Sequence, residues 1–376
     1  MKKSIIIISV ILGILALAGG VYFAWKKSQE ILTPPTSPII PTFPTTPTIP
    51  TSPTSNLKII SDQPVFDYFV RRSLGEGGLA TSTEIFYIAQ DGKIFKIIEN
   101  TEDEIISSQI IDNLQQVKSS SNGERILIKS GSANSPQFNI FNAADKIWEL
   151  LPSGITAADF SPDNKKIAYL KTNGDKNDLI TKNISGTRTT KIISLSQKDF
   201  GLKWLTTEII LLIPKPSFQI NADIWEVNTK NKTIKKIASG RGLMVNWSTN
   251  GDLGMKFSVD QRRNSYLDLI DNEGVVQANF DFSTLPDKCL FNLAKIYCAI
   301  PQAHNSIQEP VLPDDYLKRA VYFEDFIYEM NLEQNTFEVI YAEPELAIDA
   351  FRLSTSNNQL LFINRYDDKL YSLVIE

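Results

Sequence analysis

The side chains that most often carry out chemistry are scarce in this sequence. Among 376 residues there are one histidine, His304, and two cysteines, Cys289 and Cys298. Nucleophilic catalysis pairs a Ser, Cys or Thr with a base, and structural zinc sites take four Cys or His ligands. The composition therefore excludes histidine-rich metal sites and four-cysteine zinc sites. We expect no metal and no other cofactor, and we expect that the chain is not an enzyme.

Carboxylates supply the remaining candidates for acid–base chemistry. The densest group comprises Asp314, Asp315, Glu324, Asp325 and Glu329. Paired carboxylates can act as acid and base only when one of them is desolvated, which raises its pKa. An acidic surface loop is the favoured interpretation of this group, and catalysis by carboxylates is the alternative.

Other short motifs do not indicate an activity. No G-x-S-x-G pentapeptide of a serine hydrolase occurs. The run Gly75–Gly78 lacks the Lys-Ser/Thr of a phosphate-binding loop, and Asp175–Asp178 lacks the glutamate that completes a calcium loop. Both segments are interpreted as turns.

The two cysteines are placed to form a disulfide across a hairpin. If Leu293-Ala294 is the centre of the turn, Cys289 lies directly opposite Cys298. Opposed residues of an antiparallel pair have Cα atoms about 4.5–5.5 Å apart, a separation that a disulfide bridges. A shift of one residue would place the side chains on opposite faces, leaving two buried thiols as the alternative.

The elements that position these residues are short β-strands that recur with a regular period. Equivalent anchor positions, each at the end of an alternating strand before a polar turn, are separated by 41, 41, 44, 43, 44 and 62 residues. The period matches the ~40–45 residues of a four-stranded propeller blade. The anchors are Gly78, Ser119, Phe160, Trp204, Trp247, Phe291 and Leu353.

Seven anchors predict an all-β, seven-bladed β-propeller over residues 57–376, with a β-sandwich as the alternative. Only 23 residues follow Leu353, enough for three strands. The segment Leu57–Ser61 is expected to supply the outer strand of the last blade, because closing a sheet from both termini leaves no long free edge. The tryptophans Trp204, Trp225 and Trp247 are expected to pack between neighbouring blades.

One blade resembles a known repeat. The segment Phe160–Tyr169, F-S-P-D-N-K-K-I-A-Y, is similar to the WD40-like repeat of TolB-type β-propellers, close to F-S-P-D-G-x-x-I-A-Y. Asn164 replaces the turn glycine, and asparagine also accepts a positive φ. A weaker likeness, over Lys288–Tyr328, is to single-span propeller proteins of bacteria. The resemblance implies a propeller and no particular partner.

The longest interval between anchors predicts an insertion in blade six. It exceeds the usual 43 residues by 19, and we place the extra residues at about 302–317. Insertions in propellers form loops on one face, often the binding face. His304, Asp314, Asp315 and Tyr316 are therefore predicted to form a recognition loop, with a loop of no function as the alternative.

A membrane anchor is expected before the propeller. After a short tail of residues 1–3, Ser4–Trp25 is a 22-residue stretch without charge, flanked by lysines on both sides. About 20 apolar residues span a bilayer as a helix, and aromatic residues beside lysines are typical of the membrane interface. The alternative is a cleavable signal peptide, for which Ala16-Leu17-Ala18 offers a site.

A proline-rich stalk is predicted between anchor and propeller, over residues 26–56. Proline stands at every third position from Pro35 to Pro53, and threonine is frequent between. Polyproline II has three residues per turn, so all these rings line one edge of an extended rod. A proline-rich ligand for an aromatic groove is the alternative. We expect a single-pass cell-membrane protein, N-terminus inside, with the propeller extracytoplasmic.

Charge narrows the class of partner. Without residues 1–56, which carry four lysines and one glutamate, 34 basic and 42 acidic side chains remain, a formal net charge of −8. Such a domain repels phosphate backbones, so no nucleic-acid partner is expected. The sequence favours a binding or scaffolding module for a protein, a peptide or a cell-envelope polymer. The alternatives are a carboxylate-dependent enzyme acting on a glycan in the propeller channel, and a structural component of an envelope complex.

Overall fold

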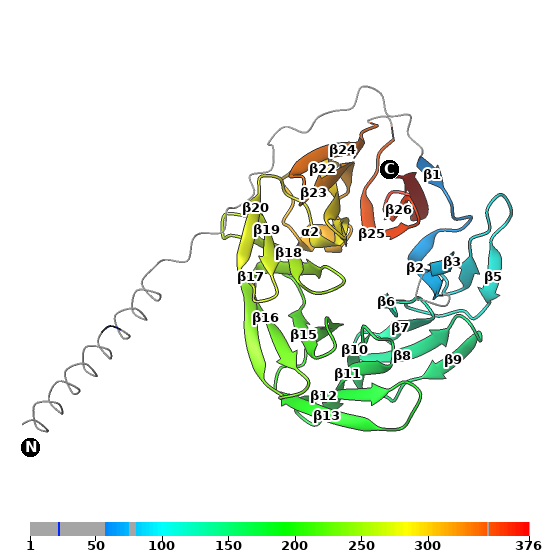
Figure 1. Cartoon of the computed structure of the whole chain (residues 1–376), viewed down its shortest axis with the longest axis vertical. Helices are drawn as coiled ribbons and strands as arrows, with labels where there is room; N and C mark the ends of the chain where they lie inside the picture. Colours follow the sequence, from blue (N-terminus) through cyan, green and yellow to red (C-terminus); the bar gives the residue numbers. More distant parts are fainter. Residues whose placement is uncertain (1–21, 23–56, 75–79, 344–345, 376) are drawn as a thin grey trace, which may run out of the picture. The chain divides into compact units, whose positions relative to one another are not determined.

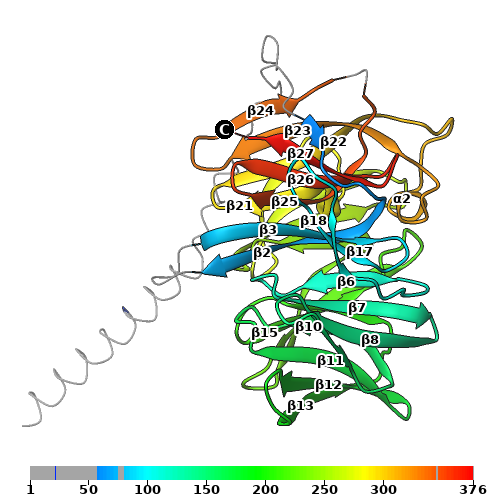
Figure 2. The same cartoon turned by 90° about the vertical axis from the view of Figure 1, so that its right-hand side faces the viewer.

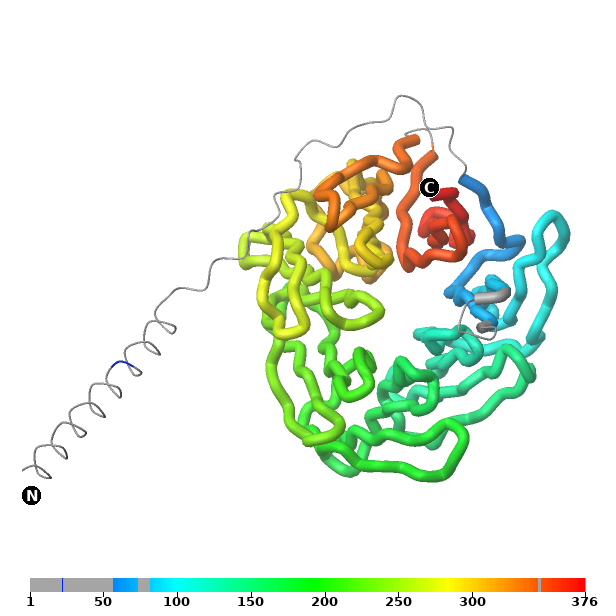
Figure 3. Tube along the Cα trace, viewed as in Figure 1, coloured from blue at the N-terminus to red at the C-terminus, as the bar shows by residue number. Residues whose placement is uncertain are grey.

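Short antiparallel strands joined by tight turns form most of the folded part of the chain. The chain divides into two compact units, 1–41 and 42–376, and the second is described below. Figures 1 and 3 show its sheets following one another in chain order around a central axis. Figure 2 shows the same sheets from the side. The computed structural model describes Tyr22 and residues 57–74, 80–343 and 346–375.

Within the described residues, the strands group into five four-stranded sheets and one seven-stranded sheet. Their bounds are β1 Leu57–Ile59, β2 Val65–Leu74, β3 Ala80–Ala89, β4 Ile94–Lys96, β5 Glu104–Ser107, β6 Gln116–Ser119, β7 Arg125–Ser132, β8 Ser135–Asn142, β9 Ile147–Leu150, β10 Ile155–Phe160, β11 Lys166–Asn173, β12 Lys176–Asn183, β13 Thr189–Leu195, β14 Phe200–Trp204, β15 Ile209–Pro214, β16 Asn221–Asn228, β17 Ile234–Trp247, β18 Leu253–Val259, β19 Ser265–Asp271, β20 Val276–Phe280, β21 Cys289–Asn292, β22 Lys295–His304, β23 Phe323–Asn331, β24 Thr336–Tyr341, β25 Ala350–Ser356, β26 Gln359–Asn364 and β27 Lys369–Val374.

The seven-stranded sheet is two blades that share one long strand. Strand β17 pairs with β16 through its first half and with β18 through its second half. Dividing the sheet there gives seven four-stranded units, which we number as blades 1 to 7. They are β2–β5, β6–β9, β10–β13, β14–β17, β17–β20, β21–β24, and β25–β27 together with β1. The fold is an all-β propeller, as the repeat predicts.

The N-terminal strand closes the last blade. Strand β1 pairs antiparallel with β27, with Leu57 opposite Leu373 and Ile59 opposite Tyr371. The backbone N–H of Ile60 extends the pairing by donating to the Leu370 carbonyl at 2.9 Å. The predicted closure by strands from both ends of the domain is confirmed.

The turn between β10 and β11 shows why the repeat has its sequence. Ser161 Oγ donates to Asp163 Oδ1 at 2.6 Å and accepts from the Lys166 N–H at 2.9 Å. Asn164 adopts a φ of 58°, the left-handed region that asparagine tolerates. The replacement of glycine by asparagine in this repeat is therefore accommodated without a change of turn.

The core is divided among the contacts between neighbouring blades. Within the described residues, seven clusters of buried apolar side chains each join two successive blades, and one of them joins blade 7 to blade 1. Trp204 and Trp247 belong to two of these clusters, and Trp225 packs against the same cluster as Trp204. The expectation that the tryptophans pack between blades is confirmed.

A disulfide joins the first two strands of blade 6. Cys289 and Cys298 lie opposite each other on β21 and β22, are bonded through their sulfur atoms, and have Cα atoms 4.1 Å apart. Leu290 faces Tyr297 in the same ladder. This is the register that the hairpin centred on Leu293-Ala294 predicts.

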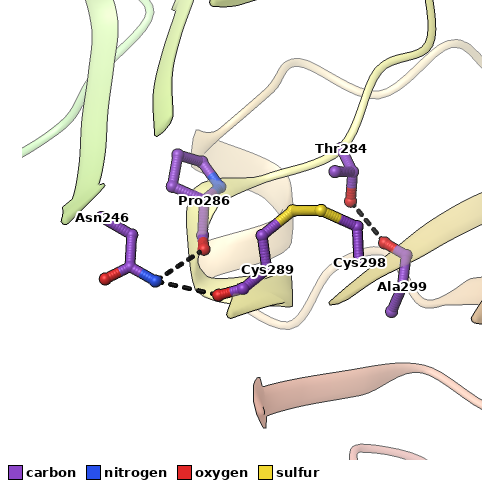
Figure 4. The surroundings of a disulfide bond; sticks show 6 residues. All are labelled: Asn246, Thr284, Pro286, Cys289, Cys298 and Ala299. Carbon is purple, nitrogen blue, oxygen red and sulfur yellow. Dashed lines mark hydrogen bonds between the residues drawn. A yellow bond between two sulfur atoms is a disulfide. The ribbon is translucent and has the colours of Figure 1, made fainter. Parts of the chain in front are cut away.

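Hydrogen bonds from neighbouring segments hold this hairpin in place (Figure 4). The Asn246 side-chain amide, on β17 of blade 5, donates to the carbonyls of Pro286 at 3.3 Å and Cys289 at 2.9 Å. Thr284 Oγ1 donates to the Ala299 carbonyl at 2.6 Å. Pro286 begins η1 (Pro286–Lys288), a single 3-10 turn that leads into β21.

The predicted membrane span and stalk, residues 4–25 and 26–56, lie outside the described residues apart from Tyr22. In the part of the chain that is described, no helix has both the length and the apolar character needed to cross a bilayer.

Candidate functional site

The innermost strands of blades 2 to 5 line a cavity of about 770 Å³. Five lysines and one aspartate contribute the formal charges of its wall, so we name it the lysine cleft. Amide and hydroxyl side chains, including Gln115, Gln116, Asn134 and Thr156, add hydrogen-bonding groups. The charged residues are Lys118, Lys129, Lys198, Lys203, Lys215 and Asp199.

Two lysines of the cleft have lowered pKa values, mainly because they are buried. Burial lowers the pKa of Lys118, and the charge of Lys203 adds to that effect, although Asp159 opposes it. Burial also lowers the pKa of Lys129, and the nearby charge of Lys215 acts in the same direction. Burial is the larger cause of both shifts and a neighbouring lysine adds to it in each, so a bound anion would stabilise the charged lysines.

A smaller cavity of about 230 Å³ lies beside the cleft and shares two lysines with it. We name it the channel pocket, because its wall comes from the innermost strands of blades 1, 2, 3, 4 and 7. The lining residues are Asp67, Tyr68, Val117, Lys118, Ser119, Asp159, Lys203 and Arg352.

A β-bulge places Arg352 in the channel pocket. The register of β25 against β26 shifts between Phe351 and Ser354, and Arg352 has a φ of 55°. This left-handed conformation costs a non-glycine residue roughly 1 kcal/mol and recurs at functional sites. The Tyr68 hydroxyl fixes the bulge by donating to the Arg352 carbonyl at 2.5 Å, and it also lies 2.8 Å from Ser354 Oγ.

Asp67 is the carboxylate that faces Arg352. Its Oδ1 accepts from the Tyr68 N–H at 2.9 Å, and its Oδ2 lies 2.7 Å from Arg352 Nη1. The side chain is 4% exposed, and burial raises the pKa of Asp67 to about 6 although the charge of Arg352 lowers it. The group therefore changes charge close to neutral pH.

Asp159 is the second carboxylate of the pocket and is held by the backbone. Its Oδ2 accepts from the Trp204 N–H at 2.8 Å, and its Oδ1 accepts from the Phe160 N–H at 3.1 Å. Lys118 Nζ lies 3.7 Å from the same carboxylate and also donates to the Leu202 carbonyl. Asp159 thus ties blade 3 to blade 4 and partly balances the charge of Lys118.

The repeat carried a signal for this site that our sequence analysis did not use. In five of the repeats, the residue directly before the anchor lines one of the two cavities. These residues are Lys118, Asp159, Lys203, Asn246 and Arg352. Aligning the anchors and comparing the preceding position would have brought three cations and one carboxylate together.

The predicted recognition residues lie in and beside the connection between β22 and β23. His304 is the last residue of β22 and pairs with Phe323, so the insertion begins after it rather than at residue 302. The bulge between Pro301 and Ala303 permits this longer strand. His304 Nε2 lies 4.0 Å from Glu309, and the pair lines a third cavity, of about 490 Å³, with several aromatic rings.

The two aspartates of the insertion are engaged with the protein backbone. Asp314 Oδ2 accepts from the Phe218 N–H at 2.6 Å, and its Oδ1 accepts from Ser217 Oγ at 3.2 Å, which ties the insertion to blade 4. Asp315 Oδ2 accepts from the Val311 N–H at 2.7 Å. Both residues belong to α2 (Asp314–Leu317).

Tyr316 of α2 is buried rather than presented to solvent. Its ring stacks on Phe323 with centroids 5.4 Å apart, and the Arg365 guanidinium lies 3.8 Å above it. Asp314 and Tyr316 thus attach the insertion to the rest of the fold, whereas Asp315 binds a residue within the insertion, and the recognition role of this loop stays a prediction.

The interpretation of the acidic cluster as a surface loop is wrong for Asp325. Its carboxylate is fully buried and lies 2.6 Å from Lys288 Nζ, whose side chain is also inaccessible. Lys288 Nζ also lies 2.5 Å from Asp349, and Asp349 lies 2.9 Å from Arg365. Two cations thus balance two carboxylates beneath the insertion. Among the described residues, no three His, Cys, Asp or Glu side chains are grouped as metal ligands.

Solved structures of similar fold are β-propellers. An oligogalacturonate lyase in complex with manganese has a TM-score of 0.56 and 12% identity, with 89% of this chain and 96% of that chain covered. The oligogalacturonate lyase of Vibrio parahaemolyticus has a TM-score of 0.55 and 12% identity, over 86% of this chain and 98% of that chain.

The C-terminal WD40 domain of Sif2 is similar over 85% of this chain and 98% of that chain, with a TM-score of 0.51 and 14% identity. No protein-family model matches the sequence, and no curated protein matches it. The similarity is thus one of fold, and the chain has a β-propeller fold like that of the WD40 domain.

Proposed function

We propose that this protein is a binding module that holds an acidic polymer of the cell envelope in the lysine cleft. The observation that carries the proposal is the concentration of five lysines against one aspartate in one cavity. The domain as a whole has a formal net charge of −8, so the positive charge is local and not a general property of its surface.

The chemistry of the cleft favours a carboxylate-bearing chain over a neutral one. Lysines on β6, β7, β14 and the segments beside β14 and β15 are spread along the cleft, so several acidic groups of one chain can be bound together. Oligogalacturonate, named as the substrate of two proteins of similar fold, is an acidic oligosaccharide of this kind. An acidic peptide is the alternative ligand.

Calorimetric titration of the full-length chain in mild detergent tests the proposal. Oligogalacturonate is expected to bind, with affinity falling as salt rises, while neutral dextran does not bind. The double variant Lys129→Gln/Lys215→Gln is expected to bind at least about tenfold more weakly. Lys230→Gln, at a lysine that is 78% exposed and outside the cleft, is the matched control.

Two outcomes would count against this ligand class. Equal binding of dextran would show that the lysines do not select the ligand. Binding of poly-L-glutamate but not of oligogalacturonate would point to a peptide partner. Single-stranded DNA serves as a further polyanion, and we expect it not to bind to a domain of net negative charge.

We further propose that the propeller is displayed outside the cell on the proline-rich stalk, anchored by residues 4–25 with the N-terminus inside. The uncharged stretch between lysines and the proline at every third position support this placement. Protease added to intact cells is expected to cut within residues 31–55 and to release a fragment of about 35 kDa. A chain that stays intact in cells whose surface is open to protease would contradict the placement.

An enzyme that acts on an acidic glycan is the second candidate. Asp67 and Asp159 line the channel pocket, and a carboxyl with a pKa of about 6 could exchange a proton near neutral pH. Incubation with oligogalacturonate, followed by mass analysis of the sugar, separates the two functions. Shortened products that disappear in Asp67→Asn would establish catalysis.

A further inference from the structure

We propose that Arg352 binds one carboxylate of the ligand inside the channel pocket. In the absence of ligand the Asp67 carboxylate contacts the Arg352 guanidinium, and the ligand carboxylate takes its place on binding. The inference rests on the proposed function, because it concerns the innermost group of a chain that lies in the lysine cleft. The cleft and the pocket share Lys118 and Lys203, so the two cavities are adjacent.

Arg352 has unused hydrogen-bonding capacity that faces a cavity. A guanidinium carries five N–H donors and binds a carboxylate best through two parallel hydrogen bonds. Asp67 is the one carboxylate within ion-pair distance of Arg352 among the described residues, and its shortest contact is with Nη1. The arginine side chain is 40% exposed, so its remaining donors are open to a ligand.

The contact between Asp67 and Arg352 is a charge contact of poor geometry. Nη1 lies 2.7 Å from Asp67 Oδ2, yet the two groups do not meet at hydrogen-bonding angles, and Oδ2 accepts no hydrogen bond. A ligand carboxylate that approaches from the cavity can take two N–H donors in plane. The exchange therefore replaces a weak internal contact by a stronger external one.

Charge and volume select a single carboxylate. Three cations and two carboxylates line the pocket, an excess of one positive charge, and Asp287, outside the lining, also interacts electrostatically with Arg352. Lys203 has no ion pair within the described part of the chain, and it is the cation left over. A carboxylate carries one negative charge, whereas a phosphate monoester carries about 1.5 to 2. The volume of about 230 Å³ equals that of roughly seven or eight water molecules, enough for one acidic sugar unit.

The position of Arg352 is built into the fold. The bulge in β25 turns this residue toward the channel, and Tyr68 of blade 1 holds the bulge through the Arg352 carbonyl. The Tyr68 hydroxyl oxygen also lies 2.9 Å from the Leu361 carbonyl oxygen, on the neighbouring strand β26. The guanidinium is therefore presented by a rigid backbone, as a recognition residue needs to be.

The test is titration of tri-galacturonate into the full-length chain at pH 7 and low salt. Arg352→Gln is expected to bind at least about tenfold more weakly, because the planar carboxylate contact is lost. Asp67→Asn is expected to bind about three- to tenfold more tightly, because its neutral amide no longer competes for Arg352. The two members of one ion pair thus have opposite predicted effects.

Matched controls separate this effect from a loss of structure. Arg188→Gln and Asp281→Asn change exposed residues outside both cavities and should leave the affinity unchanged. Thermal unfolding of each variant reports whether it is folded. If Arg352→Gln does not fold, Arg352→Lys, which keeps the charge and loses the fork, should bind with intermediate affinity.

The possible outcomes distinguish a failure of the role assigned to Arg352 from a failure of the proposed binding function. Unchanged affinity of folded Arg352→Gln or Arg352→Lys, together with weak binding by Lys129→Gln/Lys215→Gln, would overturn the role of Arg352 and leave the proposed function standing. Weaker binding by Asp67→Asn would overturn the exchange. Absence of binding by the wild-type chain would overturn both.

Discussion

Lys288 carries a positive charge on a fully buried side chain. Burial by itself would lower the pKa of Lys288, but the negative charges of Asp325 and Asp349, together with the Tyr316 hydroxyl, raise it overall. The lysine is therefore charged, and its neighbours compensate the loss of hydration. Removing one partner of such a group leaves an uncompensated buried charge.

Replacement of Lys288 by methionine should be strongly destabilising. Asp325 and Asp349 would remain close together without the cation between them, and we expect a loss of about 3–5 kcal/mol in the free energy of unfolding. Urea denaturation measures the loss. Lys230→Met, at a side chain 78% exposed, is the control and should change stability by less than about 1 kcal/mol. A similarly small change for Lys288→Met would show that the buried pairs do not stabilise the fold.

Asp67 should make stability depend on pH. Its pKa is about 6 in the folded chain and lies near 3.9 in an unfolded one. The folded state thus binds the proton more tightly, so the contribution of Asp67 is fully present below pH 4 and is lost as pH rises through 6. The difference corresponds to at most about 3 kcal/mol.

Asp67→Asn should therefore gain stability relative to wild type as pH rises from 4 to 7. Thermal unfolding at several pH values measures this gain, and Asp281→Asn, at an exposed position, is the control. A difference between Asp67→Asn and wild type that is the same at pH 4 and pH 7 would contradict the raised pKa.

Prediction from sequence succeeded for residues whose partners are close in the chain. The pairing of Cys289 with Cys298 follows from a short hairpin, because one turn determines the register. The partners of Lys288 come from β23 and from the residue before β25, which no local pattern connects. Buried ion pairs between separate elements therefore could not be predicted from the sequence.

At the scale of elements, the β21–β22 hairpin joins the cleft to blade 6. Asn246 lines the lysine cleft and also donates to the carbonyls of Pro286 and Cys289. The position of the hairpin and the position of a cleft residue are thus coupled. A change in the hairpin should mainly lower the free energy of unfolding, and it should have a smaller effect on ligand binding in the cleft.

The double variant Cys289→Ser/Cys298→Ser should fold with lower stability. A cross-link that closes a ten-residue loop contributes about 2–3 kcal/mol in the chain-entropy description. Urea denaturation without reductant measures the difference, and wild type with reductant should approach the variant. Mass analysis of the non-reduced wild type should show two hydrogens fewer than the reduced chain. Two thiols that label freely after unfolding would contradict the bond.

The insertion in blade 6 shows where prediction from a repeat stops. The long interval between Phe291 and Leu353 located the extra residues between β22 and β23. It could not show that Asp314 binds the backbone of Phe218 in another blade, or that Tyr316 is buried. Such contacts join residues that lie far apart in the chain or in different blades. They therefore depend on the tertiary fold, which a local pattern does not show.

At the scale of the whole propeller, stability is shared among the contacts between blades. Each of the seven apolar clusters within the described residues joins two successive blades, and the cluster between blades 7 and 1 completes the series. The repeat predicted this arrangement because its period specifies identical neighbours. It did not specify the cavities, which depend on side chains that differ from blade to blade.

Deletion of Leu57–Ile59 should weaken the closure of the last blade. The variant loses the β1–β27 pairing, leaves an unpaired edge on β27, and should lose about 2–4 kcal/mol. Thermal unfolding and light scattering measure the loss and the increased self-association expected of a free edge. Deletion of Thr51–Pro53 shortens the chain equally and is the control. Equal stability of the two deletions would show that β1 is dispensable.

The pairing of β1 with β27 also determines the order of events during biosynthesis. The ribosome makes Leu57 hundreds of residues before Leu373, its partner in the ladder. Throughout that time β1 has no partner strand, and blade 1 lacks the apolar contact with blade 7 that covers one of its faces. Contacts so distant in the chain form slowly and late. The ring is therefore completed only after Leu373 has been made, and until then the nascent chain must be kept from pairing its open edge with another molecule.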